Sequence, residues 1–169
     1  MSAGLTAAVA SVHRELDLLA PLFREAVERA LAGCRERNLD AYVYETYRTP
    51  ELQALYYARG RTVIPPLKRV TYASDNLYSW HGYGLAVDVI SKSQGWNRPE
   101  SWFREVARSF QEQNCRWGGE WTMKDLPHFQ WGRCKPSPSD LARQLFHAEG
   151  VEAVWNAVRA VDRRDGGAP

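Results

Sequence analysis

The most informative segment of the chain is residues 79–90, with the sequence SWHGYGLAVDVI. Its second half, residues 85–90, is a short apolar run that predicts a buried strand. Asp88 interrupts this run between two valines, and a carboxylate there is costly to bury unless it pairs with a cation or binds a metal. His81 precedes the strand, and the glycines at positions 82 and 84 allow the backbone to approach other groups closely. The segment therefore predicts a strand that carries a paired or metal-binding carboxylate.

A second polar cluster lies in residues 117–131, WGGEWTMKDLPHFQW. Pro127 biases the residue before it toward extended geometry, so a stiff linker holds Asp125 and His128 close together. His81, Asp88 and His128 are a legitimate ligand set for catalytic zinc, with a fourth position left for water. Asp125 then supplies a second carboxylate for general acid–base chemistry. Spacing alone leaves a second interpretation open, in which these residues are buried and hydrogen-bonded without a metal.

The other patterns predict short strands separated by helices and loops. Apolar residues spaced by three and four predict a helix over 11–37, which Pro21 either divides or kinks. Thr49 as N-cap, Pro50 in the first turn and Gly60 at the end predict the next helix. Because the strands lack a regular βαβ rhythm, we expect an α+β fold. The further expected elements are a strand at 41–47, a long loop at 61–79, a helix at 100–113, a strand–turn–strand unit at 115–133 and helices beyond Pro138.

Length, composition and charge narrow the class of protein. A chain of 169 residues with 44% hydrophobic and 25% charged residues is typical of one globular domain and excludes a disordered chain. A net charge of +2 argues against a nucleic-acid or membrane-surface partner. The three cysteines suit buried thiols better than a disulfide framework. No apolar run reaches the roughly 18 residues of a membrane span, and residues 1–10 lack the basic start of a signal peptide.

Three blocks of the chain resemble the M15 family of zinc peptidases: residues 47–61, residues 79–88 and residues 117–130. They follow the order of the family and together span about residues 42–131. The resemblance is greatest to the L-alanyl-D-glutamate endopeptidases, which include phage endolysins and related bacterial wall enzymes. It implies a small antiparallel sheet that carries the zinc site, with helices on its flanks and a helical C-terminal extension.

The resemblance also implies roles for individual residues. His81, Asp88 and His128 match the three ligands of one Zn²⁺ ion per chain, and Asp125 matches the catalytic acid and base. Glu120 is a rival for the role of base, but Asp125 precedes His128 by three residues, where the family places its carboxylate.

The resemblance extends to substrate binding. Arg48 matches an arginine that contacts substrate and stabilises the developing oxyanion, a role that suits a fixed cation. Ser79 is expected to support the site by a hydrogen bond or to contact substrate. Residues 72–78 lack the glycine turn that the family has before its first block, which puts the substrate preference in doubt.

The expected activity is therefore hydrolysis of an amide in peptidoglycan stem peptides, between L-Ala and D-Glu. Alternatives are D,D- or L,D-carboxypeptidase or dipeptidase activity, or a non-catalytic zinc-containing binding module. We expect a peptidase domain at 1–135, a helical extension packed on it at 136–161 and a flexible tail at 162–169. We also expect a monomer made in the cytoplasm that reaches the wall after release, for which a phage holin is one route.

Overall fold

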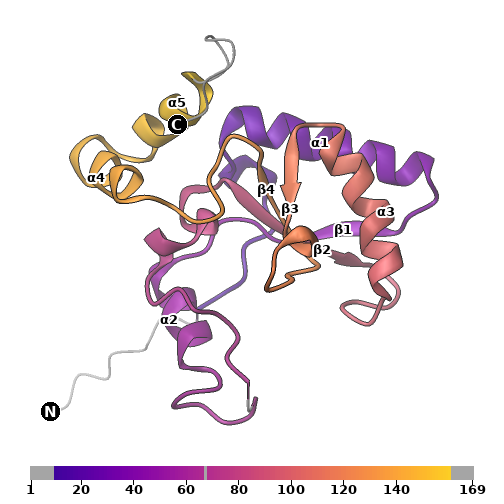
Figure 1. The fold of residues 1–169 in the computed structure, drawn as a ribbon, viewed down its shortest axis with the longest axis horizontal. Coiled ribbons are helices and arrows are strands. Elements are labelled where there is room, and N and C mark those ends of the chain that lie inside the picture. Colours follow the sequence, from indigo (N-terminus) through magenta and orange to yellow (C-terminus); the bar gives the residue numbers. More distant parts are fainter. Residues whose placement is uncertain (1–9, 67, 161–169) are drawn as a thin grey trace, which may run out of the picture.

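Four short segments of alternating side chains build one antiparallel sheet. In the computed structural model, which describes residues 10–66 and 68–160, these strands are β1 (Ala41–Glu45), β2 (Ala86–Ser91), β3 (Cys115–Trp117) and β4 (His128–Trp131). Their order across the sheet is β1-β2-β4-β3, and every neighbouring pair is antiparallel. Helices flank the sheet, which confirms the α+β class (Figure 1).

Helices α1 (Pro21–Glu36) and α3 (Glu100–Gln111) pack against each other beside the sheet (Figure 1). The ring of Phe110 in α3 stacks on Phe129 in β4 at a centroid distance of 4.2 Å. Phe129 pairs with Val87 across β4 and β2, so both side chains belong to the helix-facing layer of the core. Alternation then places Asp88 and His128, their neighbours in sequence, on the opposite face of the sheet.

The first helix is shorter than the pattern of residues 11–37 predicts. It begins at Pro21, preceded by a single 3₁₀ turn at Leu16–Leu18. Proline disfavours helical geometry in the residue before it, and Ala20 is accordingly extended, with ψ of 134°. Pro21 therefore starts a new helix rather than kinking one long helix.

The segment between β1 and β2 contains α2 (Pro50–Ala58), a long loop and two 3₁₀ helices, η2 (Asn76–Tyr78) and η3 (Trp80–Tyr83). Thr49 caps α2 as expected, because its hydroxyl accepts a hydrogen bond of 3.2 Å from the Leu52 amide. The loop joins α2 to the two 3₁₀ turns that precede β2, and η3 carries His81.

Helices α4 (Asp140–Glu149) and α5 (Val151–Ala160) follow the sheet and pack on η3. The indole N–H of Trp155 donates to the Tyr83 carbonyl at 2.6 Å, and the Phe146 ring lies 5.7 Å from that of Tyr83. These contacts join the two C-terminal helices to the turn that precedes β2. The boundary at residue 135 stays a prediction, and the tail expected at 162–169 lies outside the described residues.

The sequence contains no apolar run long enough for a membrane span, and its three cysteines are expected to be buried thiols. None of the helices in the described ranges is long and apolar enough to cross a membrane. Cys34, Cys115 and Cys134 are buried free thiols.

Asp40 ties the start of β1 to the turn that follows β2. Its Oδ2 accepts hydrogen bonds from the Ser91 hydroxyl at 2.7 Å and from the amide and hydroxyl of Ser93 at 2.9 and 2.6 Å, while Arg98 lies 3.2 Å from Oδ1. These bonds, above all those from Ser93, hold the pKa of the carboxyl well below its ordinary value.

We expect Asp40→Ala to lower the free energy of unfolding at pH 7 by about 1.5–3 kcal/mol, because several hydrogen bonds to a charged group are lost. The lowered pKa means that this stabilisation is present above the unfolded value of about 3.9 and disappears as the pH falls toward the folded value. Urea denaturation of both proteins at pH 7 and pH 3 measures the difference. The control is Glu25→Ala, which breaks an exposed ion pair and should change little. Equal losses in the two variants at pH 7 would contradict the expectation.

Candidate metal and catalytic site

Strand register brings three acidic or imidazole side chains into one row across the sheet. Glu45 in β1 pairs with Asp88 in β2, and Asp88 pairs with His128 in β4. A register shift between Val43 and Glu45 in β1 accompanies this alignment. The row lies on the face opposite the helices, so its polar groups gather where a ligand can reach them.

His81 reaches the same row from η3. The Ser79 hydroxyl accepts a 3.4 Å hydrogen bond from the His81 amide at the start of this turn, and the His81 carbonyl accepts one from the Arg48 amide at 3.1 Å. Position 82 has no room for a side chain, because a Cβ there would lie 2.1 Å from the Asn76 carbonyl oxygen. The hydrogen bond from the His81 amide to the Ser79 hydroxyl stabilises the turn that carries His81. Contact between Ser79 and substrate stays a prediction.

The two imidazoles are oriented by acceptors on their outer nitrogens. His81 Nδ1 lies 2.8 Å from the Thr46 carbonyl, which can only accept, so Nδ1 carries the hydrogen and Nε2 carries the lone pair. That Nε2 is buried without an aligned hydrogen bond and lies 3.3 Å from Asp88 Oδ1. A buried lone pair that faces a carboxylate is unfavourable, and a proton or a metal cation between the two groups would remove this cost.

His128 is oriented in the same way by Gln130. The Gln130 amide nitrogen donates to the Lys135 carbonyl at 2.8 Å, which turns its oxygen toward His128 Nε2, 2.9 Å away. In the neutral ring Nε2 therefore donates, and the lone pair is on Nδ1, 3.6 Å from Asp88 Oδ1. Such a bond on the outer nitrogen is typical of metal-binding histidines.

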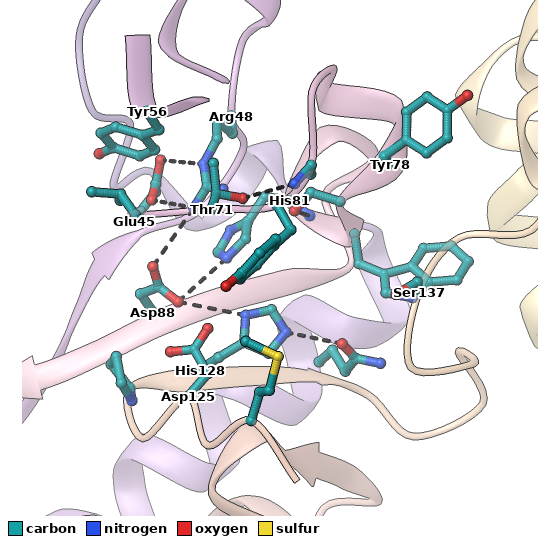
Figure 2. A pocket seen from close by; sticks show the side chains of 18 of the residues that line it. Glu45, Arg48, Tyr56, Thr71, Tyr78, His81, Asp88, Asp125, His128 and Ser137 are labelled. Atoms are coloured by element: carbon teal, nitrogen blue, oxygen red, sulfur yellow. Dashed lines mark hydrogen bonds and ion pairs between the residues drawn. The ribbon is translucent and has the colours of Figure 1, made fainter. Parts of the chain in front are cut away.

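The donor set fits zinc. His81, Asp88 and His128 each offer one ligand atom, and the three atoms lie within 4.8 Å of one another (Figure 2). A tetrahedral zinc with ligands at about 2.0–2.1 Å separates them by roughly 3.3 Å, close to the 3.3 and 3.6 Å found here. The residues expected from the sequence to bind the metal are thus brought together, with their lone pairs converging.

Electrostatics distinguish the two aspartates of the site. Burial opposes the charge of Asp88, yet His81 and His128 hold the pKa of its carboxyl well below the ordinary value. Asp125 is an exposed residue that faces the cleft. The protein atoms around its carboxyl nevertheless displace water, which raises the pKa of this group, and the charge of Asp88 raises the pKa further. A carboxyl with a raised pKa next to an ionised carboxylate is suited to exchanging protons.

Backbone contacts place Asp125, and not Glu120, in the site. The Asp125 amide donates to the Gly118 carbonyl at 3.0 Å, and the Asp125 carbonyl accepts from the His128 amide at 3.3 Å. Its side chain lines the cleft beside His128 (Figure 2). The Glu120 carboxylate instead accepts a hydrogen bond of 2.8 Å from Gln111 on α3 and is absent from the cleft lining.

Arg48 is buried above the row and forms a bidentate ion pair with Glu45, at 3.0 Å from Nε and 2.7 Å from Nη2 (Figure 2). Its Nη1 donates to Gln53 Oε1 at 3.1 Å, and Nη2 lies 3.7 Å from Asp88 Oδ2. Three of the five guanidinium donors are therefore used within the protein, which leaves one on each terminal nitrogen.

Sequence reasoning missed three of these residues: Glu45, Gln53 and Gln130. The alternation of strands was the available signal for two of them, because Gln130 shares a face with His128 and Glu45 lies at the end of the predicted strand at 41–47. All three are almost fully buried.

The three candidate metal ligands line a cleft of about 1080 Å³ together with Arg48 and Asp125. Residues of α2, of the loop that follows it, of η3 and of the segment 121–130 form its walls. Its lining is rich in aromatic side chains: Tyr44, Tyr56, Tyr72, Tyr78, Trp80, Trp96 and Trp121.

Comparisons with known proteins identify several proteins to which this chain is similar. Residues 73–131 match a peptidase M15 family described as D-alanyl-D-alanine carboxypeptidase. The peptidoglycan L-alanyl-D-glutamate endopeptidase CwlK of Bacillus subtilis strain 168 is 30% identical over 125 residues, which are 66% of this chain and 72% of that protein. Among solved structures, the L-Ala D-Glu endopeptidase ChiX of Serratia marcescens superposes with a TM-score of 0.51 at 23% identity, over 76% of this chain and 95% of that one. The vancomycin-resistance D,D-pentapeptidase VanY, solved with Zn(II), gives 0.49 at 16% identity, over 88% and 92%.

We expect Gln130→Ala to weaken zinc binding about tenfold to a hundredfold, because His128 loses the acceptor that fixes its ring and its lone pair. Competition with a chromogenic chelator measures the affinity without reference to activity. Ser109→Ala is the control for the general effect of a buried polar group, since Ser109 bonds to Arg37, away from the cleft. Unchanged zinc affinity in a folded Gln130→Ala protein would show that the glutamine does not position the ligand.

Proposed function

The chain belongs to the M15 family of peptidases, and from this we propose that it is a zinc metallopeptidase that hydrolyses the amide bond between L-Ala and D-Glu in peptidoglycan stem peptides. The observation that carries the proposal is the convergence of His81, Asp88 and His128 within 4.8 Å in the lining of an open cleft, with Asp125 beside them. The choice of bond is supported by the relative CwlK, which covers most of the chain.

His81, Asp88 and His128 would hold the zinc ion, which when bound acts as a Lewis acid that polarises the scissile carbonyl and activates water. Asp125 accepts the proton of the attacking water and then passes it to the leaving amine nitrogen. Its raised pKa favours the first step, because the carboxylate accepts a proton more readily than that of an ordinary aspartate.

Arg48 contributes a fixed positive charge. Its bidentate bond with Glu45 prevents the guanidinium from turning, so the remaining N–H groups have one orientation. In the proposal they stabilise the negative charge that develops on the carbonyl oxygen. Because Glu45 is buried, removing the arginine would also leave an unpaired charge in the core.

Two alternatives remain candidates. D,D- or L,D-carboxypeptidase or dipeptidase activity is supported by the description of the matched family and uses the same ligand set. A non-catalytic zinc-containing module is less compatible with a cleft that contains both Asp125 and Arg48. The proposed enzyme acts on the cell wall after release from the cytoplasm, with a phage holin as one route.

The test is digestion of purified peptidoglycan and of synthetic stem peptides, with mass analysis of the products. We expect free D-Glu amino termini, about one zinc per chain by elemental analysis, and loss of cleavage after chelation that added zinc restores. Release of terminal D-Ala alone would instead identify a carboxypeptidase. A zinc-loaded protein that cuts no stem peptide would contradict the proposal.

We expect Asp125→Asn to retain zinc and to lower kcat by about 10²–10⁴-fold, because the amide cannot accept the proton of the attacking water. Glu120→Gln is the matched control, since this carboxylate bonds to Gln111 outside the cleft, and its kcat should stay at the wild-type value. The reverse ranking of the two variants would transfer the role of base to Glu120.

A further inference from the structure

Two arginines that line the cleft, Arg59 and Arg69, come from neighbouring backbone segments. Arg59 ends α2, Arg69 lies ten residues further on, and both line the cleft. Gly60 and Lys68, which adjoin them in sequence, are in direct backbone contact: a Cβ on Gly60 would lie 2.3 Å from the Lys68 carbonyl oxygen and 2.7 Å from the Arg69 amide nitrogen. Gly60 also has a positive φ of 76°, so a glycine is required for this close approach.

The contacts of both guanidinium groups are with aromatic rings. Arg59 lies 5.4 Å from the centroid of the Tyr56 ring, and Arg69 lies 6.0 Å from that of Tyr72. Within the described part of the chain, neither has a carboxylate at ion-pair distance. The other cations of the cleft differ in this respect, because Arg48 is paired with Glu45 and Lys124 with Glu100 at 2.9 Å.

Neither arginine is neutralised by a carboxylate within the described residues, so both guanidinium groups can pair with an anion at this wall of the cleft. Arginine offers paired N–H donors that match the two oxygens of a carboxylate, and an aromatic ring beneath each guanidinium limits its motion. Within the described residues, neither arginine lies at ion-pair distance from Asp88 or Asp125, so an anion bound by them lies apart from the metal ligands. The arrangement therefore favours a ligand with a free carboxylate at some distance from the scissile bond.

We infer that Arg59 and Arg69 form a subsite for a free carboxylate of the stem peptide. The inference rests on the proposed function and adds a determinant of specificity to it. A stem peptide supplies such a group at two places, the α-carboxyl of its γ-linked D-Glu and its C-terminus. Binding at a site remote from the reacting amide is expected to act on KM more than on kcat.

The test uses three synthetic peptides based on N-acetyl-L-Ala-γ-D-Glu-L-Lys-D-Ala: one with both carboxylates free, one amidated at the D-Glu α-carboxyl and one amidated at the C-terminus. Calorimetry with zinc-loaded Asp125→Asn protein measures binding without turnover. We expect one of the two amidations to weaken binding about tenfold to a hundredfold, and this identifies the carboxylate. In the double variant Arg59→Gln/Arg69→Gln, the free and amidated peptides should bind alike.

Lys124→Gln is the matched control, because this cation lines the same cleft but is neutralised by Glu100, and it should keep the preference for the free carboxylate. The Arg59→Lys/Arg69→Lys variant keeps the charge and should restore part of the preference, which separates charge from a folding defect. Equal binding of all three peptides to the Asp125→Asn protein would overturn the inference. If the wild-type enzyme cut none of the peptides, the proposed function would be contradicted. The binding measurements would still decide the inference about the subsite.

Discussion

The site depends on the register between strands β1, β2 and β4. Pairing of Glu45 with Asp88 and of Asp88 with His128 puts three polar side chains into one row, while Phe129 on the other face packs against α3. A slip of one residue in β4 would send His128 into the apolar core and Phe129 into the cleft. The free energy of core packing therefore also fixes the ligand geometry.

Charge balance provides a second reason why these residues fit a divalent cation. Glu45, Asp88 and Asp125 are three carboxylates, and Arg48 is the one guanidinium paired within the row. With both histidines neutral, ionisation of all three leaves two uncompensated negative charges, which one Zn²⁺ ion would offset. The two aspartates differ in environment, since His81 and His128 lower the pKa of Asp88, whereas burial and the charge of Asp88 raise the pKa of Asp125.

Sequence patterns predicted the strands, the cap of α2 and the groups that converge as ligands, because each depends on local spacing or on a short motif. The break at Pro21 was one of the two expected outcomes, but the residues before it form only a single 3₁₀ turn, although their apolar spacing predicted a helix. Glu45 and Gln130 were missed because their roles depend on partners in other strands or beyond the sheet, at Arg48 and Lys135. Residues whose function arises only from tertiary contacts have no signature of their own in one sequence.

The Tyr83 carbonyl, which receives the Trp155 indole, belongs to the turn that carries His81. The Lys135 carbonyl receives both the Trp80 indole and the Gln130 amide. Helix α5 thus stabilises the turn that carries His81, and the chain leading to α4 stabilises Gln130, which orients the His128 ring. A shortened protein that ends at residue 135 would lose the Trp155 hydrogen bond to the turn that carries His81, so we expect it to hold this ligand less firmly than the full chain does.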